Sequence, residues 1–225
     1  MMRKPLYDRS WLAAAVVTLF ALGLLMLGAI VASRAGGAAT EATGSQSFGA
    51  AMSALAFEII FLATALFFLF KLGDPPRLGK FLPALAWGLC GGAAILALDW
   101  LFSWLSTLAG LKTGLNPDFI PHARNEWIGW AVTLPFVAVG EELFFRGLLP
   151  ALYRAVNAPA GLSLVLACAL FGLIHFGEGP AAPFIAAFLA LIFFFLKNKS
   201  GGLLAPIIAH LLVDAAGLVL TAHGA

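Results

Sequence analysis

Charged residues are scarce in this chain of 225 residues, at 11% of the sequence. Soluble domains carry about 25% charged residues, whereas 62% of this chain is hydrophobic and its mean hydropathy is +0.99. A water-soluble core cannot bury that much apolar sequence, so the shortage of charge excludes an ordinary soluble domain. The sequence also lacks a basic cluster of the kind that binds nucleic acid, and no nucleic-acid partner is expected.

Cysteine is almost absent. Cys90 and Cys168 each lie inside an apolar run, and no C-x-x-C pattern occurs. A disulfide scaffold and a thiolate metal site are therefore not expected. Both side chains are predicted to be small, buried apolar groups.

Long apolar runs alternate with short polar segments along the whole chain. Only helices and closed barrels cross lipid, and runs of this length without polar alternation exclude a barrel. The sequence therefore predicts an all-α polytopic membrane protein with about seven transmembrane helices around a polar intramembrane cavity. The expected helices are 11–33, 48–70, 81–105, 127–153, 161–176, 181–196 and 203–221, with an eighth if the segment 81–111 breaks near Asp99.

The first apolar run is longer than the 7–15 residues of a signal-peptide core, so it is interpreted as a transmembrane helix. Basic residues then favour one side of the membrane, with ten of the 13 lysines and arginines on the side of the N-terminus. The positive-inside rule places that side in the cytoplasm. The ten are Arg3, Lys4, Arg9, Lys71, Arg77, Lys80, Arg146, Arg154, Lys197 and Lys199, and the other three are Arg34, Lys112 and Arg124.

Ionisable residues inside membrane helices cost a few kcal/mol each and indicate function by default. Two of them are isolated in the sequence. Asp99 is expected near the outer interface, and Glu58 is expected in a structural pair or in contact with water. The others fall in three predicted helices, which suggests that the helices face each other around a wet site. They are Glu141, Glu142, Arg146, His175, His210 and Asp214.

The spacing of these residues predicts their directions. Glu142 and Arg146 are four apart with the acid first, the favoured order for a helical ion pair. Glu141 then points about 100° away from that pair, free to face another helix. His210 and Asp214 are also four apart, so both project from one face of the last helix.

A carboxylate in a low-dielectric pocket suits a general base that takes a proton from water. The two histidines allow two mechanisms. In one, Glu141, His175 and His210 bind a divalent metal such as zinc and leave one coordination position open. In the other, no metal takes part, His175 orients the water, and His210 with Asp214 donates hydrogen bonds to a developing oxyanion. Both predict hydrolysis of an acyl bond, with a peptide as the favoured substrate.

Three short motifs occur in an order that resembles the CAAX protease and bacteriocin-processing family, also called the Abi family. EELFFR is similar to its E-E-x-x-x-R motif, FGLIH to its F-x-x-x-H motif, and HLLVD to its H-x-x-x-N/D motif. The resemblance covers residues 127–221. It divides a single membrane domain, residues 1–225, into N-terminal helices (1–126) and a catalytic helix core (127–221).

The resemblance implies an intramembrane endopeptidase in which Glu141 activates water, His175 assists it, and His210 with Asp214 lines the oxyanion side. It implies supporting roles for Glu142, Arg146 and Phe171. The CAAX-cleaving members have Asn where this chain has Asp214. A carboxyl group donates a hydrogen bond only when protonated, so Asp214 is expected either to carry a proton or to orient His210.

The expected partners are a peptide or lipidated-peptide substrate and membrane lipid, with no required cofactor and zinc as the alternative. The expected location is a bacterial-type plasma membrane. Two other classes of function fit the same residues, a non-catalytic membrane scaffold or sensor and a small proton or cation transporter. The sequence does not identify the substrate.

The helix layout leaves one question of depth. Glu141 lies ~21 Å below Trp127 at 1.5 Å per residue, whereas His175 ends its own predicted helix. If the two side chains meet, the helix of residues 161–176 starts deeper, tilts, or ends within the membrane at Gly177–Pro180.

Overall fold

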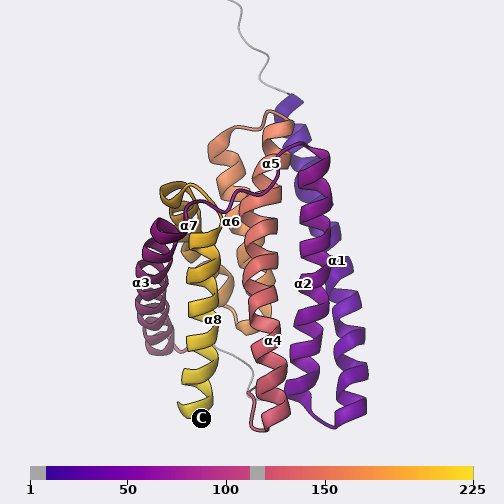
Figure 1. Cartoon of the computed structure of the whole chain (residues 1–225), viewed down its shortest axis with the longest axis vertical. Helices are drawn as coiled ribbons and strands as arrows, with labels where there is room; N and C mark the ends of the chain where they lie inside the picture. The colour runs from indigo at the N-terminus through magenta and orange to yellow at the C-terminus, as the bar shows by residue number, and fades with distance from the viewer. Residues whose placement is uncertain (1–8, 112–119, 225) are drawn as a thin grey trace, which may run out of the picture.

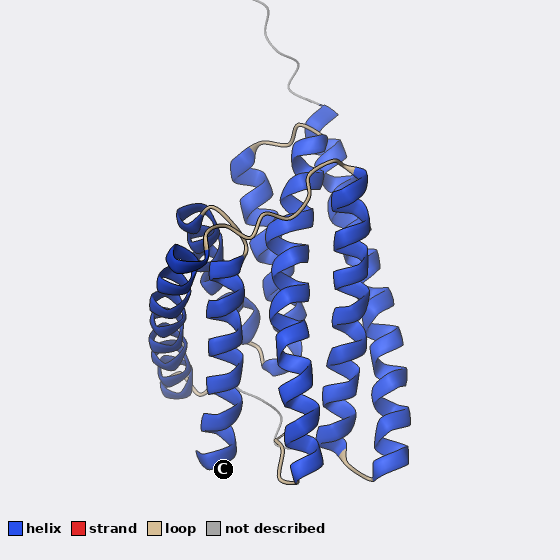
Figure 2. Ribbon diagram, viewed as in Figure 1, coloured by secondary structure: helices blue, strands red, loops and turns tan. Residues whose placement is uncertain are grey.

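The computed structural model describes residues 9–111 and 120–224, and every regular element in these ranges is helical (Figure 1, Figure 2). Two elements are not α-helical, a π-helix (η2) and a short 3₁₀-helix (η3). In chain order the elements are α1 (Arg9–Thr43), α2 (Gln46–Lys71), α3 (Phe81–Leu108), α4 (Arg124–Glu141), η2 (Glu142–Leu148), α5 (Leu149–Ala155), α6 (Ala160–Ile174), η3 (His175–Glu178), α7 (Ala182–Ser200) and α8 (Leu204–Gly224).

Seven helical segments of the described chain are long and apolar enough to cross a membrane. One of them, Arg124–Ala155, is built from α4, η2 and α5, and another, Ala160–Glu178, from α6 and η3. The surface of the bundle carries many exposed leucine, isoleucine, valine and phenylalanine side chains, as expected of a surface that faces lipid. The predicted class, an all-α polytopic membrane protein, is confirmed.

The first polar separator differs from the prediction, because α1 continues through most of RAGGAATEATGSQS and ends at Thr43. The reason is packing against α2. A Cβ on Gly36 would lie 2.8 Å from the carbonyl oxygen of Gly49, so the two backbones touch there. This contact gives the end of α1 a partner, which outweighs the weak helix propensity of its glycines and threonines.

The third helix also decides between seven and eight spans. α3 runs without a break through Asp99 to Leu108, so the alternative of an eighth helix from this segment is wrong. Cys168 is buried as predicted, whereas Cys90 on α3 is exposed on the surface of the bundle.

α2 and α4 pack in parallel with a constant register (Figure 1). Thr133 Oγ1 donates a hydrogen bond to the carbonyl oxygen of Ala51 at 3.1 Å, across 82 positions of the chain. Farther along, the ring of Phe61 stacks on that of Phe144 with centroids 4.4 Å apart. Because this second pair keeps almost the same offset, the register of α2 against α4 holds along the segment that leads to the site.

The hairpin of α6 and α7 turns back about halfway along α4 and α8 (Figure 2). Gly179 makes the turn with φ 118°, a conformation that L side chains rarely adopt. Gly172 lies directly against the carbonyl oxygen of Pro183, leaving no space for a side chain between the helices. Of the three ways for His175 to reach Glu141, the structure therefore shows that the helix ends at depth.

The bundle has two distinct ends. α1 begins at the end that holds the α2–α3, α5–α6 and α7–α8 connections, and the C-terminus lies at the other end with the α1–α2 turn (Figure 1).

Arg146, which was predicted at the cytoplasmic surface, is fully buried in the interior instead. Arg3, Lys4, Lys112 and the side chain of Arg9 lie outside the described residues. The cytoplasmic position of the N-terminus stays a prediction.

Glycines bring α3 against α8. A Cβ on Gly88 would lie 2.7 Å from Ile208 Cβ and 2.9 Å from the carbonyl oxygen of Ala205. Gly92, one turn on, faces the Ala209 backbone, with a built Cβ 3.3 Å from its Cα. Small residues at helix interfaces allow the close backbone approach that stabilises helix pairs in lipid.

We expect Gly88→Ala to lower the midpoint of thermal unfolding in detergent, because overpacking a close helix contact costs about 1–3 kcal/mol. Gly23→Ala is the matched control, since a Cβ at Gly23 has nothing within 4 Å. The control is expected to leave the midpoint unchanged or slightly higher. Equal midpoints for the two variants would contradict the close α3–α8 contact.

Candidate active site

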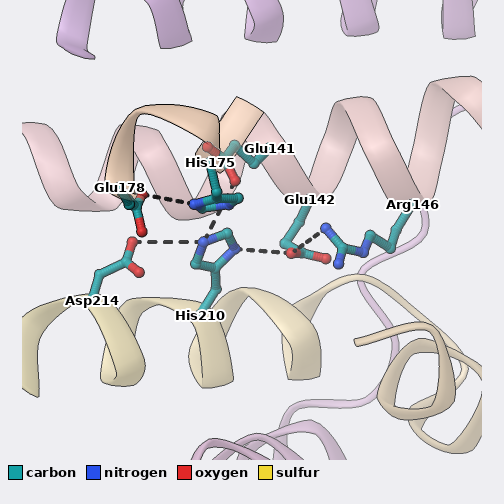
Figure 3. A network of polar contacts seen from close by, with 7 residues as sticks. All are labelled: Glu141, Glu142, Arg146, His175, Glu178, His210 and Asp214. Atoms are coloured by element: carbon teal, nitrogen blue, oxygen red, sulfur yellow. Dashed lines mark hydrogen bonds and ion pairs between the residues drawn. The ribbon is translucent and has the colours of Figure 1, made fainter. Parts of the chain in front are cut away.

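Polar side chains from three membrane segments meet inside the bundle (Figure 3). The segment of α4 and η2 supplies two carboxylates and an arginine, the end of α6 with η3 supplies a histidine and a carboxylate, and α8 supplies a histidine and a carboxylate. The group comprises Glu141, Glu142, Arg146, His175, Glu178, His210 and Asp214.

Glu142 holds the centre of this group. Its Oε1 lies 3.0 Å from Arg146 Nη1 and 2.9 Å from His210 Nδ1. Glu142 and Arg146 are fully buried, and His210 is 4% exposed. A carboxylate can only accept hydrogen bonds, so His210 donates from Nδ1. One carboxylate therefore neutralises a buried guanidinium and fixes the imidazole of α8.

Aromatic rings enclose the guanidinium. The Arg146 Cζ atom lies 4.2 Å from the centroid of Phe171, 4.8 Å from that of Phe193 and 5.5 Å from that of Phe194. Such cation–π contacts are strongest where water is excluded. The ring of Phe171 also lies 4.9 Å from that of His175. Phe171 is thus packed under the polar group.

The π-helix that carries Glu142 and Arg146 has a local cause in the sequence. Pro150 lacks the N–H that would bond to the carbonyl oxygen of Arg146 in a continuing α-helix. Lys197 on α7 donates its ammonium group to that oxygen instead. π-Helical turns are frequent at functional sites. Here the turn coincides with the segment that carries the buried ion pair.

Glu141 points to the other nitrogen of His210. Its Oε2 lies 3.6 Å from His210 Nε2, and Asp214 Oδ2 lies 3.6 Å from the same nitrogen. Glu141 is 6% exposed. The adjacent glutamates thus face opposite ring nitrogens of one histidine, as their separation of about 100° on a helix allows.

His175 is held by a residue that the sequence analysis missed. Its Nδ1 lies 2.8 Å from Glu178 Oε1, three positions along in η3. Its Nε2 is buried and has no hydrogen-bond partner among the described residues. The sequence feature that could have indicated this pair is the H-x-x-E spacing at the end of the helix. Residues three apart lie on the same side of a 3₁₀ turn, so the side chains of His175 and Glu178 can meet.

All seven residues predicted for the site lie together: Glu141, His175, His210, Asp214, Glu142, Arg146 and Phe171. The two isolated acids also have partners near it. Asp99 interacts electrostatically with Glu178 and His175, and Glu58 with Glu141 and Asp214. The two acids come from α3 and α2, so five of the seven membrane segments bring a carboxylate or histidine to this region, and α7 adds Phe193.

A zinc site was the alternative use of Glu141, His175 and His210. In residues 9–111 and 120–224 no three His, Cys, Asp or Glu side chains converge as a metal-binding group. The Nδ1 atoms of His175 and His210 are each held by a carboxylate, Glu178 and Glu142. A histidine held in this way binds a metal through its other nitrogen, so the zinc alternative stays a prediction.

Two surface pockets of the described chain lie away from the polar group. One is lined by the α2–α3 connection, Arg154 and the turn after α7, and the other by α1 and α6. The polar side chains are instead packed directly against one another. Glu141, Glu142 and His210 are buried, whereas the side chains of His175, Asp214 and Glu178 are 23%, 24% and 44% exposed. The predicted polar intramembrane cavity stays a prediction.

The fold and the buried group define an integral, multi-pass membrane protein with a carboxylate–histidine site. Residues 123–216 match the model of the Rce1-like family, described as type II CAAX prenyl endopeptidases. The match confirms the family resemblance of the three motifs and covers somewhat less than half of the chain. Comparison with curated proteins and with solved structures gives no match.

We expect Arg146→Met to destabilise the protein by about 3–5 kcal/mol, because it leaves the Glu142 carboxylate buried without its partner. The double variant Glu142→Gln/Arg146→Met removes both charges and is expected to recover part of that loss. Unfolding midpoints in detergent measure both effects.

The control is Arg154→Met, which breaks the exposed pair with Asp74, whose side chains are 60% and 41% exposed. Exposed pairs contribute about 0–1 kcal/mol, so its midpoint should barely move. A loss for Arg146→Met no larger than that of the control would contradict the bracing role of the buried pair.

Proposed function

We propose that this protein is an intramembrane endopeptidase that hydrolyses a peptide bond with water activated by Glu141. The observation that carries the proposal is the meeting of Glu141, His175 and His210 in the interior, within the segment that matches the CAAX endopeptidase family. The family supports the general class of reaction, and the geometry supports the assignment of roles.

Glu141 is the general base. Among the described residues, its carboxyl group is bonded neither to Arg146 nor to a backbone donor. A carboxylate freed from structural bonds is available to take a proton from water. Glu142, whose oxygen is shared between Arg146 and His210, is unsuited to that role.

His175 orients the attacking water. Glu178 fixes Nδ1 as the donor nitrogen, so Nε2 of the neutral ring carries the lone pair and faces the interior. Water held between this nitrogen and Glu141 would be aligned by two acceptors. The water then attacks the carbonyl carbon while its proton moves to Glu141, and Glu141 returns that proton to the departing amine nitrogen as the C–N bond breaks.

His210 and Asp214 form the oxyanion side. His210 donates from Nδ1 to Glu142, so donation from Nε2 as well requires the imidazolium form. The surrounding carboxylates stabilise that positive charge. An imidazolium N–H aimed at the developing oxyanion stabilises the transition state. Asp214, at 3.6 Å from Nε2, orients the ring in this scheme.

The substrate we propose is a peptide or lipidated peptide that reaches the site from the membrane, with the N-terminus of the enzyme in the cytoplasm. No metal is assigned to the mechanism. The rival functions use the same residues differently. A scaffold does not need Glu141 as a base, and a transporter moves protons or cations without cleavage.

We expect purified wild-type protein in detergent to cleave at least one member of a panel of labelled prenylated CAAX tails and leader peptides. Glu141→Gln and His175→Ala should each lose about 100- to 10,000-fold in rate, the range for general acid–base groups. A chelator should leave the wild-type rate unchanged. Product analysis by mass spectrometry measures the cleavage.

Glu41→Gln, an exposed glutamate on α1, is the control for the loss of one carboxylate. Cleavage by Glu141→Gln at the wild-type rate would overturn the assigned base. Loss of activity with chelator, restored by zinc, would overturn the metal-free mechanism. Proton flux in vesicles without cleavage of any peptide would favour the transporter.

Glu178→Ala is expected to lower kcat by up to about 100-fold with little change in KM, the cost of a misplaced catalytic group. Glu178→Gln should retain more activity, because its amide oxygen still accepts from Nδ1. In the His175→Ala background, Glu178→Ala should have no further effect, since the two residues act as a unit. Additive losses would contradict a role through His175.

A further inference from the structure

Glu58 is a buried carboxylate to which the mechanism above gives no role. It lies on α2, outside the segment that matches the family, and is 2% exposed. Its Oε2 is enclosed and has no hydrogen-bond partner among the described residues. An ionisable group at this depth costs a few kcal/mol unless a partner offsets it, so its surroundings call for an explanation.

The register of α2 against α4 brings Glu58 to the site. Two hydrogen bonds define that register, Trp130 Nε1 to Ser47 Oγ at 3.2 Å and Thr133 Oγ1 to the Ala51 carbonyl at 3.1 Å, across 83 and 82 positions. Continued along the parallel pair, the same offset places Glu58 next to Gly140.

Gly140 is the reason that a glutamate fits there. A Cβ at position 140 would collide with Glu58 Oε2 and would lie 3.2 Å from the Glu58 carbonyl oxygen. Because Gly140 has no side chain, the Glu58 carboxyl group reaches the backbone of α4 immediately before Glu141. Glu141 is the main acidic neighbour of Glu58, and Asp214 on α8 is a second one.

The pairing explains the unpartnered oxygens. Glu58 Oε2 and Glu141 Oε2 both lack a hydrogen-bond partner among the described residues. Ionised carboxylates are acceptors only, whereas a protonated carboxyl group supplies one donor. Two carboxyl groups that share a buried site cannot both ionise. A single proton between them joins the acceptors into one hydrogen bond and leaves one negative charge.

We propose that Glu58 is a positioning residue that carries this proton and donates a hydrogen bond to Glu141. The bond holds the Glu141 carboxylate with its other oxygen toward the water and His175. This inference rests on the proposed function for its consequence in catalysis, whereas the shared proton itself is independent of cleavage. The catalytic centre then includes a residue from the N-terminal helices.

Glu58→Gln and Glu58→Met test the bond as a matched pair of similar size. Glutamine keeps a donor, so Glu58→Gln should stay within about threefold of wild type. Methionine has none, so Glu58→Met should lose about tenfold or more in kcat with KM nearly unchanged, as a misaligned base predicts. Gly140→Ala, which displaces the Glu58 carboxyl group, should lower kcat in the same way.

Unfolding midpoints identify any variant that fails to fold. If Glu58→Met fails to fold, the infrared difference between wild type and Glu58→Gln carries the test. Wild type and Glu141→Gln are assayed alongside the Glu58 variants as the active and inactive controls. If both Glu58 variants match wild type in kcat, or if Glu58→Gln loses as much as Glu58→Met, the positioning role is overturned. If wild type cleaves nothing, the proposed function fails and kinetics do not test Glu58.

Infrared difference spectroscopy detects the protonated carboxyl group directly and does not depend on cleavage of a substrate. Wild type minus Glu58→Gln at neutral pH should show the carbonyl stretch of one protonated carboxyl group, and wild type minus Glu41→Gln should not. The band in the first difference spectrum supports the shared proton whatever the kinetics show. Its absence overturns the proposal even in an active enzyme.

Discussion

The arrangement of the site depends on one buried carboxylate. Glu142 pairs with Arg146 in its own helix and accepts a hydrogen bond from His210 in another, with almost no exposure to solvent or lipid. Unpaired, either charge would cost several kcal/mol at this depth. Because the pair must be satisfied inside the bundle, α8 is fixed in rotation against η2, and Asp214 and the free side of His210 then face Glu141.

The helices around this pair are interrupted at two positions, and both interruptions bring side chains of the site together. Pro150 removes a backbone donor, η2 forms, and Lys197 donates a hydrogen bond to the Arg146 carbonyl oxygen, which has no helical donor. The α6–α7 hairpin stops at depth, with Gly172 and Gly179 allowing the tight return. If α6 crossed the whole membrane before the turn, His175 would lie beyond the level of Glu141. Irregular backbone is tolerated at such depth where protein encloses it or where it lines a water-filled cavity. Most of η2 is buried in protein, whereas no residue of η3 is buried.

Much of this could be predicted from the sequence, and the limits have physical causes. The seven spans follow from hydropathy, and the spacing of Glu142 with Arg146 and of His210 with Asp214 follows from helical geometry. Hydropathy does not report the depth at which a helix ends, so the meeting of His175 with Glu141 remained open. Glu178 and Glu58 were missed as partners because a turn and an interhelical register place them, and neither leaves a periodic signal. The length of α1 was underestimated because its packing on α2 outweighs local propensity.

The hydrolytic chemistry assigned to Glu141 is tested most directly by a single turnover of substrate in water enriched in heavy oxygen, with the masses of product and enzyme followed together. Direct attack by a water that Glu141 activates predicts one heavy oxygen in the new carboxyl terminus and an enzyme mass that never changes. A transient enzyme mass increased by a substrate fragment, or heavy oxygen incorporated into Glu141, would contradict it and show that the glutamate is itself the nucleophile.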